Sequence, residues 1–227
     1  MYNITKEIVT VRNVMDHFHW VVENQKMDHN QTKFKVYIDS GEGSLKVLAS
    51  ITEKHNDPEV MISSLEQPNN RLSGVNRVLL LAYVEDIEES HHNMRIILDL
   101  LKFSNVNFKI CADLKVVNIL LGISSHGGKF ACAFCYGESL PVAGPTRTFR
   151  HLKEQYEMYI ADGAKKKYMQ QYYNVINECL LQVDNLDVPT STIIAQPELH
   201  YVIGVTNWVF NLSKKVLGSN KYYKLVE

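Results

Sequence analysis

Apolar and polar residues alternate over two stretches early in the chain. Over 34–39 every second residue is apolar, and 45–51 repeats the pattern. A period of two predicts a half-buried strand, and the glycine-rich segment 40–44 between the stretches predicts the turn of a β-hairpin. A nearly continuous apolar run over 77–84 follows and predicts a third, more deeply buried strand.

Helical periodicity surrounds this group of strands. Apolar residues over 4–27 recur at helical spacing and predict an N-terminal helix. Residues 53–76 contain prolines and several asparagines, which predicts a long connection. The segment 87–101 carries apolar residues at steps of three and four, and Asp86 or Ser90 provides its N-terminal cap.

The second half of the chain changes from strand to helix. Residues 108–112 predict a fourth strand, 114–121 a short helix and 129–134 a fifth strand. Beyond them, 151–183 and 197–217 show helical patterns with apolar stripes.

The predicted order is therefore β-β-β-α-β-α-β followed by helices. A hairpin and a third strand, followed by a right-handed crossover to a strand beside the first, form the ribonuclease H-like layout. We therefore expect an α/β fold with a mixed sheet in which the first and fourth strands are parallel neighbours. This divides the chain into an N-terminal helical segment (1–33), a ribonuclease H-like core (34–137) and a helical insertion after the fifth strand (138–227).

The composition is that of an ordinary folded protein. Of the 227 residues, 45% are hydrophobic and 22% are charged, and the formal net charge is -1. This charge excludes DNA binding through an overall positive charge of the domain, but it does not exclude DNA binding in a local basic groove. No apolar run approaches the about 20 residues that span a bilayer. The N-terminus lacks an export signal, so we expect an intracellular protein with no membrane partner.

Two aspartates terminate predicted strands that this layout makes neighbours. Asp39 ends the first strand and Asp113 ends the fourth, so both are expected at one edge of the sheet. Carboxylates suit Mg²⁺, and two such ions activate a water or a 3′-hydroxyl and stabilise the leaving oxygen in phosphodiester chemistry. The alternative is structural, because Asp39 precedes a glycine-rich turn and Asp113 precedes a helix that it can cap.

A second cluster centres on two of the four cysteines. Cys132 and Cys135 have the Cys-x-x-Cys spacing of one half of a structural zinc site, and His126, His151 and His200 are candidates for the remaining ligands. A redox pair is one alternative, which requires the first cysteine at a helix N-terminus. Two small buried thiols at the end of a strand are the other alternative.

The chain has one basic cluster with aromatic neighbours. Lys165, Lys166 and Lys167 stand beside Tyr168 in the sequence. Such a cluster can contact a nucleic-acid backbone, but a solvated helix face is the more common explanation.

Several short motifs resemble Transib-like DDE transposases, the superfamily that contains the catalytic subunit of the V(D)J recombinase. The sequence Ile-Asp-Ser-Gly-Glu-Gly at Asp39 and the sequence Cys-Ala-Asp-Leu-Lys at Asp113 look like the strands that carry the family's first two aspartates. Cys132-Ala-Phe-Cys135 is similar to the first half of the family's zinc site. The segments that carry the resemblance are 36–51, 85–98, 108–115, 129–137 and 198–210.

The resemblance implies a function and a set of ligands. Asp39 and Asp113 would be the first two members of an acidic triad that binds Mg²⁺ or Mn²⁺ and cuts and joins DNA. Cys132 and Cys135 would hold a structural Zn²⁺. The resemblance also implies a nuclear protein with DNA as its partner, and it leaves a homodimer open.

One part of the family's pattern is missing. Its third carboxylate, a glutamate on a helix beyond the insertion, has no matching segment before Glu227, and neither do its zinc-binding histidines. We therefore expect either a truncated transposase-like fragment or a domesticated, catalytically dead remnant that binds nucleic acid or protein.

Overall fold

A computed structural model describes most of the chain. The described residues are 2–4, 8–24, 32–41, 43–53, 78–102, 108–124, 129–137, 144–195, Thr206, Val209, Phe210, Leu212, Lys214 and Lys215. Most of the connection expected over 53–76 and most of the helix expected over 197–217 lie outside them, and so do His126 and His200. The chain divides into two compact units, Met1–Ala195 and Gln196–Glu227.

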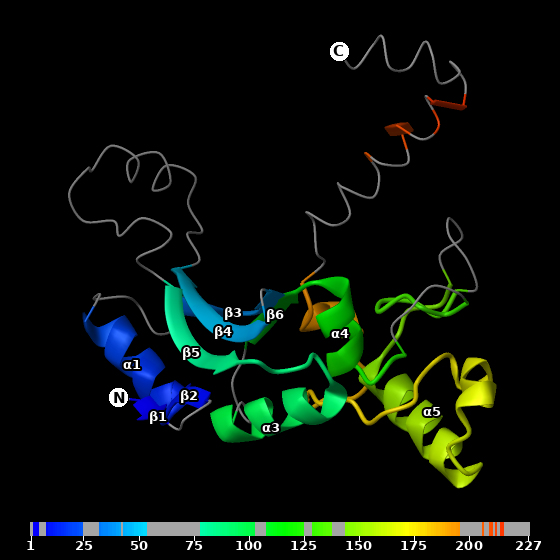
Figure 1. Cartoon of the computed structure of the whole chain (residues 1–227), viewed down its shortest axis with the longest axis horizontal. Helices are drawn as coiled ribbons and strands as arrows, with labels where there is room; N and C mark the ends of the chain where they lie inside the picture. The colour runs from blue at the N-terminus through cyan, green and yellow to red at the C-terminus, as the bar shows by residue number, and fades with distance from the viewer. Residues whose placement is uncertain are drawn as a thin grey trace. The chain divides into compact units, whose positions relative to one another are not determined.

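A six-stranded mixed sheet forms the centre of the first unit (Figure 1). Its strand order is β1-β2-β5-β4-β3-β6. The strands are β1 (Tyr2–Ile4), β2 (Ile8–Val11), β3 (Thr32–Gly41), β4 (Ser44–Glu53), β5 (Val78–Glu85) and β6 (Phe108–Ala112). Neighbouring strands are antiparallel except β3 and β6, which are parallel. The protein therefore has the mixed α/β fold that the sequence predicted.

The alternation in β3 separates the two faces of the sheet. Phe34, Val36 and Ile38 are buried, whereas Lys35 and Asp39 are exposed. β3 pairs with β4 along its whole length, and β4 pairs with β5 through one register shift. One face of the sheet thus enters the core, and the other carries polar residues.

A late segment of the chain extends the sheet beyond β6. Ile110 donates its backbone N–H to the carbonyl of Ile193 over 2.8 Å, and Ala195 donates to the carbonyl of Ile110 over 2.7 Å. These bonds form a parallel bridge between Ile110 and Ile194. The edge of the sheet beyond β6 is therefore occupied by residues that follow the helical region, and not by the segment 129–134 that was expected to be the fifth strand.

Three helices contribute apolar residues to the core with the sheet. They are α1 (Val14–Asn24), α3 (His91–Leu101), which runs below the sheet in Figure 1, and α4 (Leu114–Leu120). Side-chain oxygens of Asn13, Ser90 and Asp113 accept backbone N–H groups at their starts. Such caps satisfy donors that the first helical turn leaves free. The predicted start of α4 is confirmed, whereas α3 begins after Ser90 and not after Asp86, so 87–90 are not part of the helix.

The second half of the first unit has its own cluster of apolar residues. α5 (Phe149–Ala161) begins after Thr148, whose hydroxyl accepts the N–H of His151. It is followed by two 3-10 helices, η2 (Lys166–Tyr172) and η3 (Thr190–Thr192). None of the described helices has the length and apolarity that a membrane crossing requires.

Two predicted helical regions are partly wrong. The helix expected over 4–27 begins only at Val14, because β1 and β2 precede it. β2 is a run of four β-branched residues, which pack well on a pleated surface and lose side-chain entropy in a helix. The region expected to be helical over 151–183 breaks at Asp162-Gly163, continues only as η2 and contains no helix over 174–183.

Candidate functional site

Asp39 and Asp113 follow the last pair of the parallel ladder. That pair is Ile38–Ala112; Asp39 is the next residue of β3, and Asp113 is the first residue after β6. Neighbouring strands lie about 4.8 Å apart. Asp39 is exposed and Asp113 is half-buried. Two carboxylates that are remote in the sequence therefore occupy adjacent places at one edge of the sheet.

Asp113 also has a structural task. Its Oδ1 accepts the backbone N–H of Val116 over 2.7 Å and caps α4. The capping alternative for Asp113 is thus observed. A carboxylate has two oxygens, so capping through Oδ1 is compatible with a second ligand on Oδ2.

An ion pair next to Asp113 was not anticipated. Lys115, in the first turn of α4, pairs with Glu89, which precedes α3. The Glu89 carboxylate, as hydrogen-bond acceptor and as charge, raises the pKa of Lys115, and the charge of Asp113 adds to this. The acidic run before α3 was the only sequence feature that could have suggested it, because acidic residues there also suit a helix N-terminus.

The two aspartates form a pair and not a triad in the part of the chain that the structure describes. Within it, no three histidine, cysteine, aspartate or glutamate side chains come together closely enough to hold a metal. Mg²⁺ is commonly held by one or two carboxylates with water and phosphate oxygens completing its shell. The pair therefore fits a magnesium ion that depends on substrate for part of its coordination.

Cys132 and Cys135 lie in a loop, so the fifth strand expected over 129–134 is wrong. Each carbonyl from Lys129 to Ala133 accepts a hydrogen bond from a side chain elsewhere in the chain. The donors are Asn174 to Lys129, Arg147 to Phe130 and Cys132, Asn118 to Ala131, and Thr190 to Ala133. Buried carbonyls need partners, and here side chains take the place of a neighbouring strand.

Two antiparallel segments, 134–137 and 144–147, pass close together next to this loop. The backbones of Cys135 and Thr146 form an antiparallel β-bridge. The segments cross closely, since a Cβ atom on Gly144 would lie only 2.2 Å from the backbone nitrogen of Gly137. The glycine is therefore required, and the crossing brings backbone N–H groups to the sulfur of Cys135.

Hydrogen-bond donors surround the sulfur of Cys135. Burial raises the pKa of this thiol, but the N–H groups of Gly137 and Gly144, the thiol of Cys132 and the charge of Arg147 together lower it by more. The N–H of Phe134 lies 3.4 Å from the sulfur of Cys132. Donors directed at sulfur favour the thiolate, which is the form that binds a metal.

Arg147 is a buried cation beside this cysteine pair. Its side chain is 0% exposed, and burial lowers its pKa to about 10, so it stays charged at neutral pH. Its guanidinium donates to the carbonyls of Cys132, Phe130 and Tyr173 at 2.8, 2.8 and 3.0 Å. Among the described residues, Nη1 has no partner. A pair of thiolates would supply the counter-charge that a buried cation requires.

His151 is the one candidate zinc histidine that the structure describes. Its ring stacks on that of Tyr136 with centroids 4.3 Å apart. Burial, followed by the charge of Arg147, lowers its pKa to about 4. The absence of any three-ligand group among the described residues means that it does not complete a site with Cys132 and Cys135.

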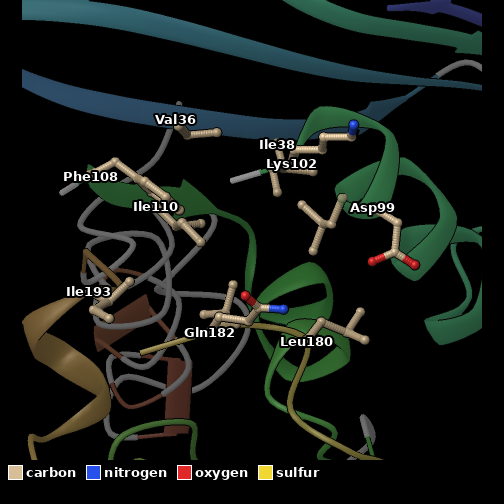
Figure 2. Close-up of a pocket in the computed structure, with 11 residues that line it drawn as sticks. Val36, Ile38, Asp99, Lys102, Phe108, Ile110, Leu180, Gln182 and Ile193 are labelled. Atoms are coloured by element: carbon tan, nitrogen blue, oxygen red, sulfur yellow. The ribbon is translucent and has the colours of Figure 1, made fainter. Parts of the chain in front are cut away.

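A cavity of about 240 Å³ lies on the core face of the sheet (Figure 2). Its walls are largely apolar and come from β3, β6, α3 and the segment 180–182, with Asp99, Lys102 and Gln182 as polar members. Val36 and Ile38 line it, and they alternate with Asp39 along β3. The cavity is therefore separate from the aspartate pair.

The family model that matches residues 1–181 is described as a domain of unknown function (DUF8703). The chain belongs to this DUF8703 family. No curated protein and no solved structure shows significant similarity to the chain. The DUF8703 match spans the sheet, both aspartates and the cysteine loop, so these features lie inside the domain that defines the family.

Proposed function

We propose that this DUF8703 domain is a ribonuclease H-like, transposase-derived domain whose parent chemistry is Mg²⁺-dependent cleavage and transfer of DNA strands. The strand order β5-β4-β3-β6, with 193–195 parallel on the outer side of β6, supports this layout. The observation that carries the proposal is the register of β3 and β6, which gives Asp39 and Asp113 adjacent positions.

Asp39 and Asp113 are the proposed metal ligands. A bound Mg²⁺ or Mn²⁺ would supply an activated water or hydroxyl and charge stabilisation at a phosphodiester. Asp39 contributes an exposed carboxylate, and Asp113 contributes Oδ2 while Oδ1 keeps α4 in place. In this proposal the DNA phosphate and water complete the coordination, and the protein acts in the nucleus, alone or as a homodimer.

The cysteine loop is the proposed anchor of a structural Zn²⁺. Cys132 and Cys135 would provide two ligands, and the donors at their sulfurs together with Arg147 fit a pair of thiolates. Zinc requires two further ligands, and sequence leaves His126 and His200 as candidates. Zinc content of the purified protein, compared with that of Cys132→Ser and Cys135→Ser, tests this assignment.

A second candidate function is a non-catalytic binding module that has kept the scaffold. The cap that Asp113 provides for α4 favours this binding module, because the capping bond gives Asp113 a structural role that requires no metal. The two candidates differ in whether the negative charge of the aspartates matters.

Substitution by asparagine separates the two candidates. Asparagine caps a helix about as well as aspartate but does not hold Mg²⁺, so Asp113→Asn keeps α4 and removes a ligand. We expect Asp39→Asn and Asp113→Asn to abolish Mg²⁺-dependent nicking of a supercoiled plasmid without lowering the melting temperature. Asp99→Asn, on α3, is the matched control and should nick like the parent.

Nicking that survives in both asparagine variants, or no Mg²⁺ binding by the parent, would refute the enzyme proposal and leave the binding module.

A further inference from the structure

The face of the sheet opposite the core is organised in rows. Every second residue of a strand points to the same face, so Lys35, Tyr37 and Asp39 of β3 all belong to this one. Their register partners in the neighbouring strands share it. One row consists of Ser50, Lys35 and Lys109, the next of Leu48, Tyr37 and Cys111, and a third of Lys46 and Asp39. Asp113 is the residue that follows β6 at this end of the sheet. The face therefore carries two lysines at one end and Asp39, opposite Lys46, at the end near the proposed catalytic edge.

Two lysines stand side by side in the first row. Lys35 and Lys109 are register partners in the parallel ladder of β3 and β6, and both are exposed. Neither amine forms an ion pair or hydrogen bond among the described residues. Like charges in directly opposed positions destabilise a sheet, so this pair has a cost that an external anion would relieve.

The row between the lysines and the aspartates offers an aromatic ring. Tyr37 is half-buried, and its hydroxyl lies 3.2 Å from that of Ser50, which fixes the ring on the sheet. Bases of single-stranded nucleic acid stack on such rings while lysines contact the phosphates. Lys35 and Asp39 are four residues apart in β3, which corresponds to about 13 Å along the strand.

We propose that this face binds single-stranded nucleic acid, with phosphates on Lys35 and Lys109 and a base on Tyr37. The strand then runs toward Asp39 and Asp113. The role of these aspartates rests on the proposed function, but binding at the lysines does not. A duplex would offer its phosphates but no unpaired base for Tyr37, so the single strand is the preferred occupant.

The basic cluster after α5 is the competing anion site. Lys165, Lys166 and Lys167 are exposed, and the Nζ of Lys167 lies 4.7 Å from the centre of the Tyr168 ring. This cluster is a sequential run at the start of η2, whereas Lys35 and Lys109 come from two strands that the fold brings together. Lys35 and Lys109 also share their face of the sheet with Asp39.

Fluorescence anisotropy with a labelled oligothymidylate tests the proposal in Mg²⁺-free buffer. An oligonucleotide of about 20 nucleotides exceeds the roughly 4–16 that one such face covers. We expect Lys35→Gln/Lys109→Gln to bind about tenfold more weakly and to lower the slope of log affinity against log salt by about 1.4, because two phosphate contacts disappear. Tyr37→Leu should weaken binding without changing that slope.

Matched variants make each outcome decisive. Lys153→Gln, on the exposed side of α5, should bind like the parent. Unchanged binding by the double lysine variant, equal losses in Lys153→Gln, or a loss confined to Lys165→Gln/Lys166→Gln would overturn the proposal, as would a parent that does not bind. The single variant Lys109→Gln provides the same test if the double variant does not fold.

The design also separates this proposal from the enzyme proposal. Asp39→Asn should abolish nicking, while its binding of the oligonucleotide in the absence of Mg²⁺ should still depend on Lys35 and Lys109. Binding that depends on the lysines, together with no nicking activity, would refute only the enzyme. Nicking without lysine-dependent binding would refute only the lysine face.

Discussion

Replacing Arg147 should destabilise the protein more than any comparable change on its surface. The side chain is fully buried, and its three hydrogen bonds join the cysteine loop to the carbonyl of Tyr173. Arg147→Leu keeps an apolar stem but leaves the carbonyls of Cys132, Phe130 and Tyr173 without these donors. All three acceptor carbonyls lie between residues 130 and 173, so the loss should come from that part of the chain.

The expected magnitude follows from the bonds that disappear. A hydrogen bond to a charged group contributes about 1.5–3 kcal/mol, so three of them give at least about 4.5 kcal/mol. Burying the guanidinium costs several kcal/mol, which the variant recovers in part. We therefore expect a net loss of about 3–5 kcal/mol, a large share of the about 5–15 kcal/mol that stabilises a typical domain.

Urea denaturation followed by far-UV circular dichroism measures this loss. Arg147→Lys should be intermediate, because an ammonium keeps the charge but cannot reach three carbonyls in one plane. Arg150→Leu is the control, since the exposed side chain of Arg150 bonds only that of Asp187 among the described residues, and it should lose far less. A loss below about 1 kcal/mol in Arg147→Leu would refute the reasoning, because three buried hydrogen bonds could not then be important.

Two predictions concern titration in the same region. Burial holds the pKa of His151 at about 4, below its ordinary 6.5, so the unfolded state binds the proton first and stability should fall as pH drops from about 6.5 to about 4. His151→Phe keeps the stack on Tyr136 and should remove this part of the pH dependence of the melting temperature, whereas an unchanged profile would contradict the assignment. Burial raises the pKa of Cys179 to about 12, while that of Cys135 is lowered, so iodoacetamide at pH 8 should alkylate Cys135 well before Cys179 in chelator-treated protein. Peptide mass spectrometry over time measures both rates, and equal rates would refute the expected difference.

The elements that local pattern specifies were predictable. The alternation around Val36 and its hairpin partner strand predicts both the pairing and the buried face, and Ser90 and Asp113 mark helix starts by their own hydrogen-bonding chemistry. The placement of Asp39 beside Asp113 needed one further step, the rule that a crossover returns beside the first strand. The order of the strands therefore predicted more of the candidate site than any single residue did.

The cysteine loop could not be predicted in this way. Its apolar run resembles a strand, but its carbonyls bond Asn118, Arg147, Asn174 and Thr190, which lie in four separate parts of the chain. Nothing local in a sequence encodes donors at such distances. The same holds for 193–195, which has too few residues to show a period of two.

The bridge between β6 and 193–195 has a consequence for synthesis and for shortened versions of the protein. The β3–β4 hairpin pairs residues that are close in the sequence. The bridge between Ile110 and Ile194, in contrast, forms only after the ribosome has added residues 111–193 and these residues have folded. Until then the outer edge of β6 presents open N–H and carbonyl groups, a template on which other chains can add strands. Proteins cut before residue 193 should therefore aggregate during expression, even though every other strand of the sheet is present.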